Sequence, residues 1–379
     1  MIYLDNAATT FPKPDAVLDA VDYCQRSFAV NVGRGGYSLA SFAAQIVDET
    51  RLLFARLVNA KGPEQVVFTP SATIAANEVV LGLPWDSYKT VYVSPFEHNS
   101  IARPLHRICS VYGIELRIIP FDGITQEWDQ EETIRLFTQD PPDYVFLNHV
   151  SNVTGVVLQV QEIAELAKTY GACVIVDASQ SLGVVDTDIQ KLYIDYLIFA
   201  GHKNLYASWG IGGFISNNEM LMPVISGGTG MDSLNLEMYA KTPGGFEVGS
   251  PNIISITSLN ASLKWLNDLG ISSIRAQKDK LMELLIKGLN LANVHLYLPK
   301  DLSKHTSVLS FNILGYEPNE VGSILSHDYD IAVRTGYHCA PFVHDLIKTR
   351  EKMGTVRVSI GFFNSENDIE TMISAVRDL

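Results

Sequence analysis

Two residues that could carry covalent cofactor chemistry follow apolar segments of the sequence. Lys203 comes shortly after the apolar run at residues 196–199, and Asp177 ends the apolar run at residues 173–176. Desolvation lowers the pKa of a lysine, and its amine can then form a Schiff base with a carbonyl group. A carboxylate at the end of a strand can hold a protonated ring nitrogen. Taken singly, Lys203 could also be a loop lysine in water, and Asp177 a helix N-cap.

Together the two residues favour an enzyme that uses pyridoxal phosphate (PLP), whose phosphate needs hydrogen-bond donors. Residues 71–77 are typical of a turn that enters a helix, with Thr73 near its start. Helix N-termini bind phosphate through free N–H groups and the macrodipole. His202 and Ser250 could add phosphate contacts. His98, which follows an apolar run, could stack on an aromatic ring or be a hydrogen-bonded surface histidine.

One of the four cysteines has the surroundings of a reactive thiol. Cys339 lies beside His338, near Arg334 and on a glycine-containing segment, and basic neighbours favour a thiolate. Arg357 is a charge inside an apolar strand pattern, and it could clamp a carboxylate or face solvent at a strand edge. The other cysteines fall in apolar strand or helix patterns and are expected to be small core residues: Cys24, Cys109 and Cys173.

The elements that must position these residues alternate along the first two thirds of the chain. Strands are expected at residues 66–68, 91–93, 116–119, 144–147, 173–176 and 196–199, and helices at residues 73–83, 103–112 and 160–170. Apolar strands separated by amphipathic helices predict a mostly parallel sheet covered on both faces. Ligands collect at the carboxyl ends of such strands, where Asp177 and Lys203 fall.

The pattern changes after about residue 260. A long helical region continues to about residue 291, and the segments that follow predict an α+β layer. Strands are expected at residues 294–297, 308–313, around 333 and at 356–358, with helices after residue 318 and after a capping box at residues 365–368. We therefore expect a second, smaller domain, with its boundary between residues 255 and 265.

Composition excludes several classes of protein. The chain has 379 residues, of which 47% are hydrophobic and 18% charged, so it is expected to fold into packed domains. Its net charge of −14 argues against nucleic-acid and anionic-membrane partners. With four cysteines, no CxxC pair and no signal-like or membrane-spanning segment, a cytoplasmic location is expected. No sequence motif predicts a nucleotide loop or a metal site.

The ordered set of motifs resembles the fold-type I PLP enzymes of aminotransferase class V, and within them the cysteine desulfurases. The resemblance covers nearly the whole chain, through residues 3–10, His98, 151–155, 177–180, 201–203, 249–252, 334–340 and Arg357. Residues 334–340 are similar to those of group II, SufS-like desulfurases, which also resemble selenocysteine lyases. The resemblance implies a large α/β domain over residues 12–258. It also implies a small α+β domain formed by residues 1–11 and 259–379.

For the cofactor ring, the resemblance implies a set of five residues. Lys203 would hold PLP covalently and act as a catalytic residue. Asp177 would pair with the ring nitrogen, and Gln180 would contact the phenolic oxygen. His98 would stack on the ring as a further catalytic residue, with Asn152 beside it and next to the substrate.

For the phosphate, the resemblance implies contacts from Thr73 and His202, and from Ser250 of the partner subunit in a homodimer. Arg357 would bind the substrate carboxylate, with Arg334 nearby.

The implied reaction converts L-cysteine to L-alanine. It leaves a persulfide on Cys339 that passes to an acceptor protein or small thiol. Three alternatives stay open: selenocysteine lyase, a C–S lyase acting on a cysteine derivative, and a PLP-fold protein that mainly binds a sulfur-transfer partner. Iron–sulfur cluster assembly, thiolation and selenium metabolism are all compatible destinations.

Three features depart from the family pattern. Ala200 stands where a serine is common, so one phosphate hydroxyl is missing, which would weaken PLP retention. Gly33 stands where desulfurases often carry histidine, and this bears on substrate or partner handling. The family opening begins at residue 3, without the extension found in many group II enzymes.

Overall fold

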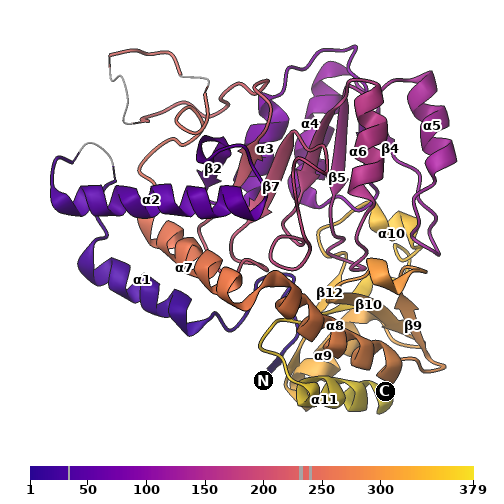
Figure 1. Cartoon of the computed structure of the whole chain (residues 1–379). Coiled ribbons are helices and arrows are strands. Elements are labelled where there is room, and N and C mark those ends of the chain that lie inside the picture. The colour runs from indigo at the N-terminus through magenta and orange to yellow at the C-terminus, as the bar shows by residue number, and fades with distance from the viewer. Residues whose placement is uncertain (33–34, 230–233, 239–240) are drawn as a thin grey trace.

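The computed structural model describes residues 1–32, 35–229, 234–238 and 241–379. A large sheet with its helices forms one part of the molecule, and a smaller sheet with its helices forms the other (Figure 1). Both termini lie in the smaller part. Gly33, whose identity departs from the family pattern, lies outside the described residues.

The large sheet has seven strands in the order β2-β8-β7-β6-β5-β3-β4. β8 runs antiparallel to both of its neighbours, and the remaining pairs are parallel, so the predicted mostly parallel sheet is confirmed. The strands are β2 (Val66–Thr69), β3 (Val91–Val93), β4 (Leu116–Ile118), β5 (Tyr144–Asn148), β6 (Cys173–Asp177), β7 (Tyr196–Ala200) and β8 (Gly212–Ser216).

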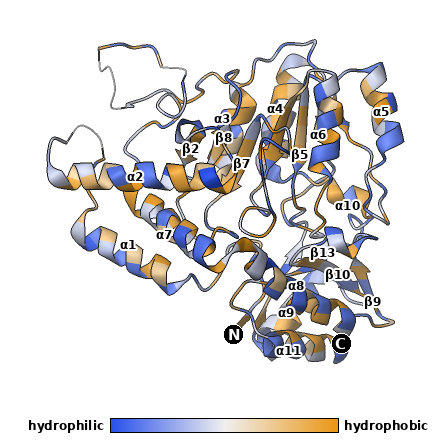
Figure 2. Ribbon diagram, in the orientation of Figure 1, coloured by the Kyte–Doolittle hydropathy of each residue, from blue (hydrophilic) through white to orange (hydrophobic). Residues whose placement is uncertain are grey.

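Both faces of this sheet are buried, as its continuous apolar strands predict. Along β6, Val174 and Val176 face a core built with α2, α6 and α7, whereas Cys173 and Ile175 face a core built with α3 and α4. The strands are correspondingly hydrophobic (Figure 2). The helices of this part are α1 (Asp15–Ser27), α2 (Ser38–Leu57), α3 (Ala72–Gly82), α4 (Asn99–Tyr112), α5 (Gln130–Gln139), α6 (Val160–Thr169) and α7 (Ile253–Leu269).

The smaller sheet is antiparallel, in the order β12-β13-β10-β9. Apolar residues of α8, α9 and α11 pack on it as a third core. Its strands are β9 (Val294–Tyr297), β10 (Val308–Ile313), β12 (Arg334–Gly336) and β13 (Thr355–Ser359). Its helices are α8 (Ile271–Gly288), α9 (Pro318–Tyr329), α10 (Val343–Leu346) and α11 (Glu366–Arg377).

The N-terminal segment joins this smaller part, because β1 (Ile2–Tyr3) pairs in parallel with β11 (Ile331–Ala332). The expected division at residues 258 and 259 stays a prediction, and that position lies within α7. The long helical region expected after residue 260 is two helices, because Gly270 adopts a φ of 80° between α7 and α8. The predicted capping box is confirmed at Ser365 and Asp368.

Within the described ranges, the structure contains no helix long and apolar enough to cross a membrane.

Candidate active site

The polar residues expected at the strand ends lie together at one edge of the large sheet. Asp177 ends β6, and Lys203 lies just beyond the end of β7, its parallel neighbour. His98 follows β3 and precedes α4. The charges of Lys203 and Asp177 both act on His98, so the three side chains share one electrostatic environment. Parallel strands bring these distant residues together because their carboxyl ends meet at the same sheet edge.

Lys203 lies in a loop that is held on both sides. The carbonyl of Lys203 accepts a hydrogen bond from Thr10 Oγ1 at 3.0 Å, and the carbonyl of His202 accepts one from Lys13 Nζ at 2.7 Å. On the other side, Asn204 Nδ2 donates to the Gln180 carbonyl at 2.7 Å. The loop backbone is therefore fixed by the N-terminal segment and by the loop after β6.

Burial lowers the pKa of the Lys203 amine. The carboxylate of Asp177 opposes this shift, whereas the guanidinium groups of Arg357 and Arg334 add to it. A lysine with a lowered pKa has a larger fraction of free amine at neutral pH, which both a nucleophile and a base require.

Asp177 and Gln180 are both buried beside this loop. The Asp177 carboxylate accepts the backbone N–H of Ser179 at 2.9 Å. No helix begins directly after Asp177 in the described part of the chain, so the alternative interpretation as a helix N-cap is wrong. Gln180 Nε2 donates to the carbonyl of Ala7 at 2.8 Å, which fixes the amide plane.

His98 is the N-cap of α4, where its Nδ1 accepts the backbone N–H of Ser100 at 3.1 Å. Burial lowers its pKa to about 4, and the positive charge of Lys203 is the next largest cause. The imidazole is therefore neutral at physiological pH, and its ring can pack on an aromatic group without adding a charge.

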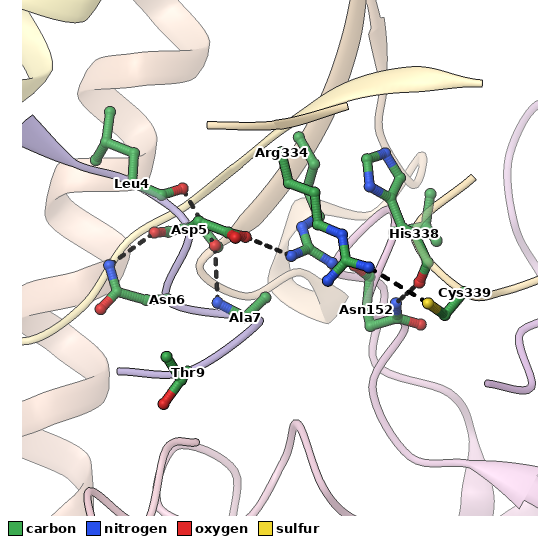
Figure 3. Close-up of polar contacts among 12 residues, drawn as sticks. Leu4, Asp5, Asn6, Ala7, Thr9, Asn152, Arg334, His338 and Cys339 are labelled. Carbon is green, nitrogen blue, oxygen red and sulfur yellow. Dashed lines mark hydrogen bonds and ion pairs between the residues drawn. The ribbon is translucent and has the colours of Figure 1, made fainter. Parts of the chain in front are cut away.

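Cys339 reaches this region from the smaller part of the molecule. Its Sγ lies 3.3 Å from Arg334 Nη2, which donates to it. Asn152 Nδ2 donates to the His338 carbonyl at 2.7 Å, and the backbone N–H of Asn99 donates to the Cys339 carbonyl at 2.7 Å. Figure 3 shows Arg334, Asn152 and Cys339 side by side. The thiol-bearing loop is thus docked on the loops of the large sheet.

Arg357 is only 1% exposed, so the alternative interpretation as a solvent-facing strand-edge residue is wrong. Its Nη2 forms an ion pair with Asp5 Oδ1 at 2.6 Å, and its Nη1 donates to the Asn152 carbonyl at 3.0 Å. In the β12–β13 pair it lies directly opposite Arg334. Two arginines therefore lie near Cys339, and one carboxylate offsets part of their charge.

The residues expected to bind phosphate are more scattered. Thr73 is exposed in the first turn of α3, whose N-cap is Ser71. The ring of His202 stacks on Trp209 with centroids 4.1 Å apart. Ser250 is exposed and accepts a hydrogen bond from Asn31 at 3.4 Å, and its described contacts do not include the loop of Lys203.

Ala200, which departs from the family pattern, ends β7 and is buried. Because it is an alanine, this position offers no hydroxyl at the sheet edge.

Several buried polar atoms in this region have no hydrogen-bond partner among the described residues. They are Asn152 Oδ1, Ser179 Oγ, Gln180 Oε1, His202 Nδ1 and Arg357 Nε. Buried polar atoms are nearly always paired in folded proteins, so a group of unpaired ones indicates that a polar ligand belongs there. Acceptors, donors, a cationic clamp and an amine fit PLP together with an amino-acid substrate.

Three contributors were not singled out from the sequence: Asp5, Lys13 and Trp209. A buried arginine requires a counter-charge, which is a general signal for a residue like Asp5. It did not identify Asp5, because 352 positions separate Asp5 from Arg357. Lys13 and Trp209 have no distinguishing sequence context, and they are recognised only by their contacts with His202.

Comparison with known proteins identifies the family to which this architecture belongs. The family model Aminotransferase class-V matches residues 2–372. The chain is 35% identical to a probable cysteine desulfurase of Pyrococcus abyssi, over 100% of this chain and 94% of that protein. It is 32% identical to a probable cysteine desulfurase of Halalkalibacterium halodurans, over 98% of this chain and 91% of that protein.

Solved structures agree with these sequence matches. The apo structure of a cysteine desulfurase from Thermococcus onnurineus superposes with a TM-score of 0.92 at 32% identity, covering 100% of this chain and 94% of that one. The cysteine desulfurase CsdA of Escherichia coli gives 0.87 at 26% identity, covering 99% and 94%. With a strand-end lysine and aspartate in the same fold, the chain belongs to the aminotransferase class-V family, among relatives named cysteine desulfurases.

Proposed function

We propose that the protein is a PLP-dependent cysteine desulfurase that converts L-cysteine to L-alanine and carries the released sulfur on Cys339. One observation carries the proposal. The thiol of Cys339, held 3.3 Å from Arg334, lies in the same electrostatic environment as the Lys203 amine, although the two come from different sheets. An amine and a thiol that serve one substrate are what desulfuration requires.

The residues at the sheet edge would hold the cofactor. Lys203 would carry it, and Asp177 would pair with the ring nitrogen. Gln180 Oε1, which has no hydrogen-bond partner among the described residues, would accept a hydrogen bond from the phenolic hydroxyl. The neutral ring of His98 would stack on the cofactor, with Asn152 beside it. When bound, PLP supplies an electron sink for negative charge that develops at the substrate α-carbon.

The phosphate would be held by His202 and Thr73, and by Ser250 of the partner subunit in a homodimer. Ser250 is exposed in one chain, and this exposure fits a contribution to a second copy. The exposed Trp209, which stacks on His202, adds an apolar surface beside the same site.

Substrate binding falls to Arg357, which would pair with the carboxylate of the amino acid. Asp5 and the Asn152 carbonyl already fix two of its nitrogens, so the guanidinium is oriented before substrate arrives. Its unpaired Nε has a free N–H to offer. Orienting the substrate in this way would bring its α-proton toward Lys203 Nζ.

Two residues of the chain would perform the chemistry. Lys203 Nζ removes the α-proton of the substrate. Cys339 Sγ, which accepts a hydrogen bond from Arg334, attacks the substrate sulfur: a sulfur–sulfur bond forms and the carbon–sulfur bond breaks. The electron pair of the broken bond stays with the carbon skeleton, which takes up protons to become alanine.

The persulfide on Cys339 must then leave. Cys339 is partly exposed, whereas the three other cysteines are buried. A thiol at that position can be reached by the thiol of an acceptor protein or a small molecule. All four cysteines have free thiols, and we propose a reducing, cytoplasmic location on that basis.

The test compares alanine release from L-cysteine, with a reductant present, for wild type and Cys339→Ala. Cys109→Ala is the matched control, because Cys109 is buried in α4. We expect alanine from wild type and from the control, and none from Cys339→Ala. If wild type releases no alanine from L-cysteine, the proposal fails. The same proteins tested on L-selenocysteine and on cysteine conjugates would then show which substrate the site accepts.

A further inference from the structure

A buried lysine that the proposed reaction does not use lies just behind the Lys203 loop. Lys278 belongs to α8, the helix that continues from α7 toward the smaller sheet (Figure 1). Its side chain is only 1% exposed. Burying an amine is unfavourable unless a partner compensates for its lost hydration, so the contacts of this amine show what it is for.

The amine of Lys278 has one hydrogen bond among the described residues, to Asn204 Oδ1 at 2.8 Å. The nearest charges on its own helix are Arg275 and Asp279, and these form an ion pair with each other. Burial lowers the pKa of Lys278 to about 7. Among the described residues Lys278 is therefore not paired with a carboxylate, and its defined partner is the side chain next to Lys203.

Asn204 connects this amine to two elements of the cofactor site. It directly follows Lys203, and its Nδ2 donates to the Gln180 carbonyl at 2.7 Å. The backbone is also closely packed at this point, because a Cβ on Gly183 would lie 2.2 Å from the backbone carbonyl oxygen of Asn204. The loops after β6 and β7 thus meet at Asn204, and Lys278 donates to the only carbonyl-type oxygen of the Asn204 side chain.

We propose that Lys278 is a positioning residue for the cofactor site. It holds Asn204, and through Asn204 it keeps Lys203 and Gln180 in register with the bound cofactor. This inference rests on the proposed function, in which Lys203 carries the cofactor. Lys203 would both hold the cofactor and remove the substrate α-proton, so a fixed loop backbone keeps its amine close to both positions. A lysine suits this task because its long side chain reaches from α8 to the loop.

The experiment is a double-mutant cycle with Lys278→Met, Asn204→Leu and the combined variant. Lys280→Met is the matched control, since Lys280 lies on the same helix and its side chain is 73% exposed. For each holoenzyme, the release of bound PLP is followed by its visible absorbance, and alanine formation is measured per bound cofactor. Urea unfolding of the same proteins without cofactor reports their stability. Cofactor retention, activity and stability are thus measured separately.

We expect Lys278→Met and Asn204→Leu each to speed PLP release about tenfold, the effect of losing a buried hydrogen bond to a charged group. The combined variant should release PLP no faster than Asn204→Leu alone, because Lys278 acts through Asn204. The urea midpoint of Lys278→Met should stay at or above that of wild type, since an apolar side chain replaces a buried amine. Lys280→Met should match wild type in every readout.

Unchanged PLP release and alanine formation in Lys278→Met would overturn the inference, as would effects that simply add in the combined variant. A lower urea midpoint with normal cofactor retention would also overturn it, because the role would then be structural. If Lys278→Met does not fold, Lys278→Gln replaces it under the same criteria. Wild type that binds no PLP through Lys203 would instead defeat the proposed function, which separates the two failures.

Discussion

In the proposed function the loop of Lys203 and the loop of Cys339 serve one site, and the two loops are built differently. The first is anchored by the half-buried amine of Lys13 and the buried amide of Asn204, which fix the backbone on either side of Lys203. The second carries two consecutive residues with positive φ, His338 at 49° and Cys339 at 59°, and its thiol is partly exposed. This difference fits the proposed function, in which the amine needs one fixed position and the thiol meets first the substrate and then an acceptor.

Removing the amine should produce the largest effect and should leave the thiol loop intact. We expect Lys203→Ala to lower alanine formation by at least about 10³-fold, because in the proposed function the residue would both hold the cofactor and act as the base. The characteristic absorbance of the bound cofactor should be lost, while alkylation of Cys339 by iodoacetamide stays normal. Alanine formation near the wild-type rate in Lys203→Ala would refute the assignment.

Two glycines offer a direct comparison of how tightly the two loops are packed. Gly183 and Gly336 have nearly the same φ, 91° and 92°, but an added Cβ meets Asn204 at the first and open space at the second. Gly183→Ala should lower the free energy of unfolding by about 3 kcal/mol, because it adds backbone strain and a clash. Gly336→Ala should lower it by about 1 kcal/mol, because it adds strain alone. Urea unfolding of both variants measures the difference. Equal losses would remove the contrast between the loops.

A smaller effect should follow when the thiol loses its cationic neighbour. In Arg334→Gln we expect alkylation of Cys339 by iodoacetamide at fixed pH to slow about tenfold, because the variant loses the positive charge and the hydrogen bond that the guanidinium directs at the sulfur from 3.3 Å. Cofactor absorbance should be unaffected. Arg350→Gln is the control, since Arg350 is exposed and pairs with Asp345. Unchanged alkylation in Arg334→Gln would show that Arg334 does not tune the thiol.

The smallest effect concerns pH and the support beneath the thiol loop. Burial lowers the pKa of His344 to about 4, and its ring packs against Tyr337. The unfolded chain, with a histidine pKa near 6.5, therefore binds more protons than the folded chain between about pH 6.5 and 4, so stability falls as pH falls through that window. Between pH 7 and 5.5 the free energy of unfolding should fall by about 1 kcal/mol less in His344→Leu than in wild type, as measured by urea unfolding. An unchanged pH dependence would contradict this.

The sequence was most informative where one physical signal dominates. Continuous apolar runs predicted β5, β6 and β7, because strands buried on both faces must be apolar throughout. The ends of those strands in turn identified Asp177 and Lys203. A mostly parallel sheet brings such positions to one edge, so the proximity of Asp177 and Lys203 could be predicted from the topology.

The parts that could not be predicted depend on contacts between distant segments. Nothing local to Lys278 indicates that it turns inward to Asn204, and nothing near Asp5 indicates its pairing with Arg357. The break at Gly270 was also missed, because a helical pattern continues on both sides of it. These features belong to the tertiary structure, where packing overrides local preference.

The central claim is that the two loops divide the work, with the amine processing the substrate and the thiol receiving its sulfur. The most direct test is to mix the holoenzyme with L-cysteine without reductant, block thiols, and map added sulfur by peptide mass spectrometry, with Lys203→Ala alongside. The account predicts one added sulfur on the peptide that contains Cys339 in wild type, and none in Lys203→Ala. Alanine formation with the added sulfur on another cysteine, or on none, would contradict it.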